Sequence, residues 1–219
     1  PTPTRVWRTR PRPVPRVAGS AAGAESEFDE IEHLVQQGVQ RRVAALRGHK
    51  VTLLEQAKEL GGQLIPAGVP PSKGKDIEFK NYLVNQVKKT PGITIKTGEK
   101  ATAESILALK PDAVVLAYGA VPIIPPIQGI NQKHVVHVLD VLNSKVEVGQ
   151  RVIIIGGGMV GLECTEYLGK QGKQVTILEI LPRAGIDVGR LTRWSLMDGL
   201  ERMGVKIEAK VDTKEITFL

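Results

Sequence analysis

The stretch VIIIGGGMVGLECTEYLGKQGKQVTILE, residues 152–179, decides the fold of this chain. Four apolar residues at 152–155 predict a buried parallel strand, and the spacing G-x-G-x-x-G follows it directly. A second apolar run at 175–178 ends in Glu179, about 20 residues after the glycines. Strand, glycines, helix, strand and acid in this order predict a dinucleotide-binding βαβ unit. The alternative is a crossover connection whose glycines serve packing alone.

Each glycine of the turn has a separate physical role. Gly156 permits the turn out of the strand, Gly158 leaves room for a pyrophosphate, and Gly161 lets the helix pack closely on the strand. The N–H groups at the helix N-terminus attract phosphates. Glu179 accepts hydrogen bonds from a ribose 2′-OH and repels a 2′-phosphate, so we predict an NADH site with NAD preferred over NADP. The predicted contacts are Gly156, Gly157, Gly158, Met159, Val160, Gly161 and Glu179.

Composition and charge limit the other functions of the chain. No apolar run approaches the roughly 20 residues that cross a bilayer, so we expect no membrane contact. The single cysteine, Cys164, excludes an internal disulfide framework and suits a reducing compartment, so we expect a cytoplasmic protein. Part of the net charge of +7 lies in residues 1–16, which hold five arginines and five prolines. This composition predicts a disordered, solvated arm, and we expect no nucleic-acid partner.

An internal repeat extends the nucleotide-binding pattern. AALRGHKVTLLE at 44–55 matches LGKQGKQVTILE at 168–179, about 124 residues later, with the same order of helix end, glycine, strand and acid. The fold class is therefore α/β, with two three-layer, Rossmann-like units around parallel strands. The remaining pattern predicts helices at 25–46, 76–89, 102–109, 138–143 and 190–203, and strands at 92–97, 113–117, 205–209 and 215–218.

From Val43 to Leu219 the chain resembles the C-terminal flavin and nucleotide part of the NADH:flavin oxidoreductases, the group of enoate reductase, dienoyl-CoA reductase and trimethylamine dehydrogenase. The resemblance rests on the NADH motif, on a Gly-Gly-Gln turn at 61–63 and on Leu-Ala-Tyr-Gly at 116–119. It implies an FAD-binding domain interrupted by a nested NAD(H)-binding domain, with hydride passing from NADH to the flavin. By resemblance, the flavin nucleotide would lie beside Glu55, Gly62, Gln63, Ala117 and Gly119.

The chain departs from this family pattern at both ends. Residues 35–42 stand where the family has its flavin phosphate-binding glycines, so we expect weak or no FAD binding. The sequence ends before the second half of the nested domain and so resembles an internal fragment preceded by 42 unrelated residues. An altered reading frame would produce such a change. The expected organisation is a basic arm at 1–24, a partial FAD-type domain at 25–148 and an incomplete NAD(H)-binding domain at 149–219.

Three functions remain open on these residues. The chain is a flavin- and NADH-dependent oxidoreductase or a fragment of one, a nucleotide-binding module without turnover, or an interaction fragment that self-associates through unpaired sheet edges. No catalytic acid, base or nucleophile is identified. We expect no metal site, because His134 and His137 would point to opposite faces of a strand. The spacing of Trp194 and Met197 predicts two core residues on one helix.

Overall fold

The computed structural model describes residues 42–117 and 119–217 of the chain. The arm expected at 1–24 lies outside these ranges. Of the helix expected at 25–46, only residues 42–46 are described, and they are helical. Within the described ranges, no helix is both long and apolar enough to span a membrane.

Two parallel sheets organise the described residues. β1 (Val51–Glu55) pairs with β2 (Ile93–Thr97) in one sheet. The second sheet has the order β3-β4-β5, formed by β3 (Arg151–Ile155), β4 (Gln174–Glu179) and β5 (Lys206–Ala209). All the pairings are parallel, which confirms the α/β fold class.

The helices lie between these strands in the chain. They are α2 (Leu64–Ala67), the 3-10 helix η1 (Pro71–Lys73), α3 (Gly74–Lys89), α4 (Ala103–Ala108), α5 (Val138–Leu142), α6 (Met159–Lys170) and α7 (Arg190–Arg202). Local chemistry explains several of their ends. Thr102 caps α4 through a reciprocal capping box with Ser105. α3 has Asp76 in its first turn and basic residues in its last, as the helix dipole favours.

The sheet β3-β4-β5 is covered by helices on one face. Leu162 of α6, Ile177 of β4 and Leu200 of α7 are completely buried in the core of this unit, and α5 packs on α6 beside them. At this sheet the structure has two layers instead of the predicted three, because α5, α6 and α7 all lie against the same face. Side chains alternate along a strand, so Ile153 of β3 points to the opposite face and is 66% exposed. The strand predicted at 152–155 forms but is not a buried one: Val152 and Ile154 are partly buried against the core, and Ile153 and Ile155 are exposed.

The predicted strand at 113–117 does not form. These residues form neither helix nor strand, and Val115 and Leu116 are 69% and 72% exposed. A parallel strand is stable only beside a neighbour that satisfies its backbone hydrogen bonds. Among the described residues, β1 and β2 pair only with each other, and this segment pairs with neither of them.

Two further predictions are wrong near the C-terminus. Residues 215–217 form no strand, and Glu215 makes only an isolated bridge with Gln128; residue 218 lies outside the described ranges. Trp194 is not a core residue but is 70% exposed. α7 directs Leu196 and Leu200 into the core, and Trp194 precedes Leu196 by two positions, which places it on the opposite side of the helix.

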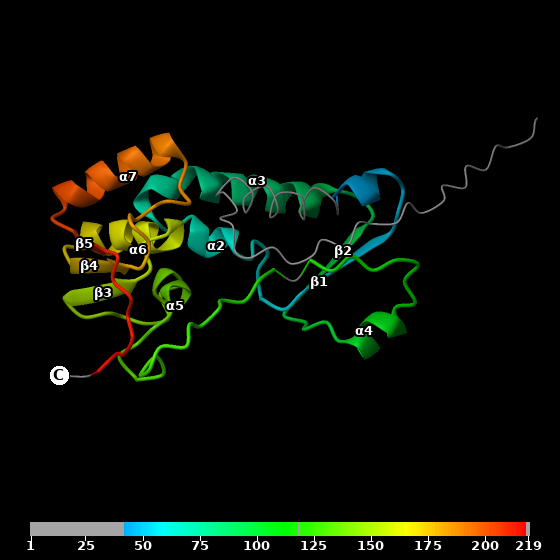
Figure 1. Ribbon diagram of the computed structural model, residues 1–219. Coiled ribbons are helices and arrows are strands. Elements are labelled where there is room, and N and C mark those ends of the chain that lie inside the picture. The colour runs from blue at the N-terminus through cyan, green and yellow to red at the C-terminus, as the bar shows by residue number, and fades with distance from the viewer. Residues whose placement is uncertain (1–41, 118, 218–219) are drawn as a thin grey trace, which may run out of the picture.

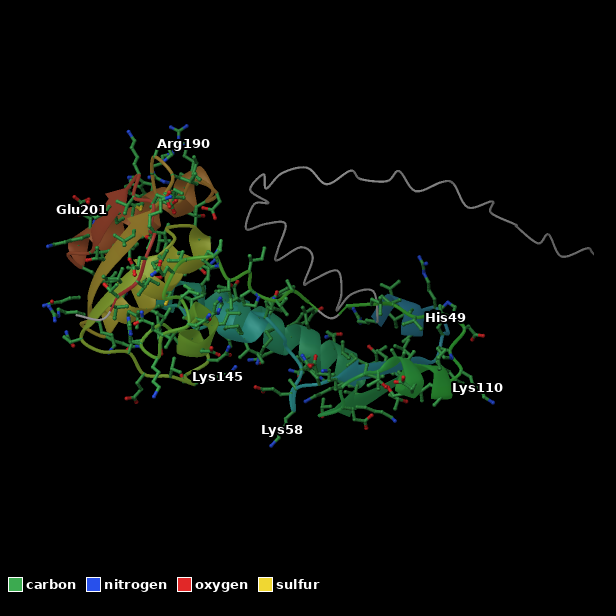
Figure 2. All side chains as sticks on the ribbon, turned by 60° about the horizontal axis from the view of Figure 1, so that its bottom comes forward. His49, Lys58, Lys110, Lys145, Arg190 and Glu201 are labelled. Atoms are coloured by element: carbon green, nitrogen blue, oxygen red, sulfur yellow. The ribbon has the colours of Figure 1, made fainter. Side chains whose placement is uncertain are left out.

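The two units are arranged along α3. Figure 1 shows β3, β4 and β5 with α5, α6 and α7 at one end of the molecule, and β1, β2 and α4 at the other. In Figure 2, Arg190 and Glu201 mark the first end, and His49 and Lys110 mark the second. η1, which directly precedes α3, contacts α6 through Ser72 and Lys73, so the first unit is attached to the second at this junction.

Candidate dinucleotide-binding site

The chain leaves β3 through a glycine turn in which two positions do not tolerate a side chain. Gly156 has φ +103°, a conformation that L side chains rarely adopt, and its N–H donates to the Leu178 carbonyl at 2.8 Å. A Cβ atom on Gly161 would lie 2.1 Å from the Gly156 carbonyl oxygen. Neither position accepts a side chain, so both glycines are required for α6 to begin directly behind β3.

The N-terminus of α6 offers unpaired donors. α6 begins at Met159, and its N-cap residue, Gly158, makes no side-chain hydrogen bond. The first four N–H groups of a helix have no intrahelical acceptor. Of these four, the Met159 N–H donates to Asp187 Oδ2 at 3.1 Å, whereas those of Gly158, Val160 and Gly161 meet no acceptor within the described part of the chain. Convergent N–H groups at a helix N-terminus are suited to bind an anion.

Glu179 holds the glycine turn against the end of β4. Its side chain is buried, with Oε2 accepting from the Gly157 N–H at 2.6 Å and Oε1 accepting from the Leu181 N–H at 2.7 Å. Each carboxylate oxygen keeps a further lone pair, so a ribose hydroxyl would add to these bonds rather than replace them. The sequence pattern located Glu179 but not this organising role.

The residues assigned to a first nucleotide gather beside the sheet β1-β2. Glu55 ends β1, and its Oε1 accepts from the Ala57 N–H at 2.9 Å. Gly62 has φ +49° in the turn before α2. The Gln63 side-chain amide donates to the Ala120 carbonyl at 3.3 Å across 57 residues of sequence. The structure thus brings the Gly-Gly-Gln turn next to the segment that holds Ala117 and Gly119.

A nearly buried ion pair joins the two units. Lys73 Nζ lies 2.8 Å from Glu163 Oε1, and the two side chains are only 15% and 11% exposed. Beside it, the Ser72 hydroxyl donates to Glu166 at 2.7 Å. Burial raises the pKa of the Glu163 carboxyl; Lys73 opposes this change, and the charges of Asp76 and Glu166 add to it. Sequence reasoning missed this junction, because η1 and α6 are distant in the chain.

The chain matches a known protein family over most of its length. A family model described as pyridine nucleotide-disulphide oxidoreductase matches residues 38–218. The chain belongs to this family. It is therefore an oxidoreductase domain of the type that depends on flavin and nicotinamide dinucleotide, which confirms the resemblance inferred from the sequence. The match begins slightly upstream of Val43, where that resemblance began.

Individual relatives agree with the family. The chain is 38% identical to a bilirubin reductase from Mediterraneibacter gnavus over 80% of its own length, and 39% identical to an NADH oxidase from Thermoanaerobacter brockii over 74%. It spans only 27% and 25% of these two proteins, about a quarter of their length. A solved structure of a 2-naphthoyl-CoA reductase complex matches 84% of the chain with a TM-score of 0.79 and 34% identity, and the chain covers 28% of that protein.

A surface groove lies apart from the glycine turn of this oxidoreductase domain. It has a volume of about 370 Å³ between α7 and β5, and Trp194 forms part of its wall. None of its lining residues belongs to the glycine turn or to the Gly-Gly-Gln turn. Among the described residues no cluster of three or more potential metal ligands is found. His137 instead caps α5, with Nδ1 accepting from the Leu139 N–H at 3.2 Å, so the strand expected around it is absent.

The raised pKa of Glu163 predicts a pH-dependent stability. A carboxyl whose pKa is higher in the folded state than its ordinary 4.5 binds its proton more tightly when folded. The free energy of unfolding therefore falls as the pH rises from about 4.5 through the raised pKa. We expect wild-type protein to lose stability relative to Glu163→Gln over this range, as measured by urea unfolding at several pH values. Parallel profiles for the two proteins would contradict this expectation.

The single cysteine is predicted to be unreactive in the folded domain. Cys164 is 2% exposed on α6, and burial raises the pKa of its thiol to about 11. At pH 8 only about one thiol in a thousand is then the nucleophilic thiolate. We expect iodoacetamide to leave the native protein unlabelled by mass spectrometry and to label the same protein in concentrated guanidinium. Rapid labelling of the native protein would contradict this burial.

Proposed function

We propose that this domain binds NADH at the N-terminus of α6 and delivers its hydride to a flavin, as part of a larger NADH-dependent reductase. The observation that carries the proposal is the set of unpaired N–H groups at Gly158, Val160 and Gly161, held in place by Glu179. These donors suit the dinucleotide pyrophosphate, and the carboxylate of Glu179 favours NADH over NADPH through the adenosine ribose.

We propose a separate role for each part of this site. The backbone at 156–161 holds the pyrophosphate, and Glu179 orients that backbone and the ribose. The nicotinamide supplies the hydride when NADH is bound, and the protein positions it. No acid, base or nucleophile of the described residues is assigned a catalytic role. We further propose that 25–148 is a partial FAD-type domain and 149–219 the NAD(H)-binding domain.

The first nucleotide site is proposed to hold FAD only weakly. Glu55, Gly62, Gln63, Ala117 and Gly119 support the ribose side of such a site. The sequence at 35–42 supplies no Gly-x-Gly-x-x-Gly turn for its pyrophosphate. This observation favours the second candidate function, an NADH-binding module that does not itself turn over.

An absorbance spectrum separates these two functions. Purified protein is incubated with FAD, desalted, and examined before and after addition of NADH, while NADH binding is measured in parallel by fluorescence. A retained flavin band that NADH bleaches supports the reductase. A colourless protein that still binds NADH supports the binding module, and a protein that binds neither contradicts both.

We further propose that the chain self-associates and that it works in the cytoplasm. An uncovered apolar surface is offered to a second copy by residues 114–116 and by Val121 and Ile123, which are 87% and 93% exposed. Sedimentation that is independent of concentration would contradict such association. The single cysteine supports a reducing compartment such as the cytoplasm.

A further inference from the structure

We propose that the carboxylate of Asp187 occupies the position of a dinucleotide phosphate at the N-terminus of α6 and thereby lowers the affinity of the domain for NADH. The inference rests on the proposed NADH site and goes beyond it by naming an internal competitor. Asp187 lies in the segment between β4 and α7, outside the glycine motif, and belongs to no recognised part of the βαβ pattern.

The geometry places the carboxylate among the helix N-terminal amides. Asp187 Oδ2 accepts from the Met159 N–H at 3.1 Å, the one of the first four amides of α6 that is paired with a described side chain. A Cβ atom on Gly158 would lie 3.0 Å from the same oxygen. The space that glycine leaves open at Gly158, which a pyrophosphate is expected to approach, therefore contains the Asp187 side chain.

The second carboxylate oxygen is incompletely satisfied. Asp187 Oδ1 is buried and has no hydrogen-bond partner. No ion pair within the described residues neutralises this carboxylate: Arg183 and Arg190 are exposed to solvent, and the Arg193 Nε donates to the Ala184 carbonyl at 2.9 Å. The helix N-terminus is thus the main positive partner of Asp187, as it would be for a phosphate.

A neighbouring anchor keeps Asp187 close to the site. The Gly185 N–H donates to the Gly157 carbonyl at 2.7 Å, and the methyl group of Ala184 lies under Gly157. The segment that carries Asp187 is therefore fastened to the glycine turn two residues earlier. A pyrophosphate entering the turn would meet a like charge about one hydrogen-bond length away, unless the side chain swings out, and either route weakens binding.

The test compares the full chain with Asp187→Asn. This substitution keeps an oxygen that accepts from Met159 and removes the negative charge. We expect the Kd for NADH, measured by nicotinamide fluorescence at low ionic strength, to fall about two- to fivefold, the range typical of one charge at a helix N-terminus. The gain should shrink as salt screens the charge. Adenosine, which has no phosphate, should bind both proteins equally.

The matched control is Asp198→Asn on α7, where the carboxylate pairs with Arg202 at 2.8 Å away from the turn. It removes the same charge and should leave the Kd unchanged. If Asp187→Asn fails to fold, as judged by thermal unfolding, Asp187→Ser supplies the same comparison.

The outcomes separate this inference from the proposed function. Wild-type protein and every variant failing to bind NADH would reject the NADH site itself. Wild-type binding with an unchanged Kd in Asp187→Asn, or an equal gain in Asp198→Asn, would overturn the role of Asp187. Weaker binding in Asp187→Asn would also overturn it, because the carboxylate would then act as a contact for the ligand. A tighter Kd confined to Asp187→Asn supports it.

Discussion

Replacing Gly161 by alanine should raise the Kd for NADH at least about a hundredfold and destabilise the domain. The new Cβ would lie 2.1 Å from the Gly156 carbonyl oxygen, a backbone atom that no side-chain rotation can move away. α6 must then shift away from β3, and its unpaired amides move with it. Forced overpacking of this kind costs about 1–3 kcal/mol, and misplaced donors lose most of their interaction with a pyrophosphate. Fluorescence titration and urea unfolding measure the two effects.

Gly199→Ala is the matched control for this substitution. Gly199 lies within α7, where a Cβ atom meets nothing within 4 Å. Alanine is preferred over glycine in a helix interior by about 1 kcal/mol, so the control should be slightly more stable and should bind NADH as the wild type does. Unchanged binding in Gly161→Ala would show that NADH does not use this turn.

Replacing Lys73 by methionine should lower the free energy of unfolding by about 3 kcal/mol at neutral pH. The change leaves Glu163 without its cation at the junction of η1 and α6. Breaking a buried ion pair by removing one partner typically costs 3–5 kcal/mol, and the lower figure applies because both side chains keep slight exposure. Urea unfolding at pH 7 measures the loss, and part of it should be recovered at lower pH, where Glu163 becomes neutral.

Lys75→Met is the corresponding control. Lys75 pairs with Glu78 on the same helix, but these side chains are 88% and 69% exposed. Exposed pairs are screened by water and contribute little, so this variant should unfold like the wild type. Equal losses in the two variants would show that the Lys73–Glu163 pair does not hold the units together.

The chain's local pattern was enough to predict most elements that form within short spans. The helices predicted at 76–89 and 102–109 and the glycine turn before α6 all form, because each depends on neighbours within one helical turn or one strand. The internal repeat likewise predicted β1 and β4, since each follows a glycine and ends in an acid.

The errors share one physical cause. The apolar runs at 113–117 and 152–155 have the composition of buried strands, but burial requires a second element on the other side. Within the described residues, no strand pairs with the first run and no helix covers the outer face of the second. Trp194 was misplaced for a related reason: the side of α7 that faces the core depends on how the helix is rotated against the sheet.

The sequence by itself determined the α/β class, the βαβ unit and the glycines of the candidate NADH site, because backbone conformation and close packing there depend on residues only a few positions apart. Tertiary structure alone decided which charged groups meet. Asp187 reaches the α6 amide 28 residues earlier, and Lys73 reaches Glu163 across the junction of the two units. These contacts cannot be predicted from a local sequence pattern. They depend on how β4, α6 and α7 pack together and on where η1 meets α6.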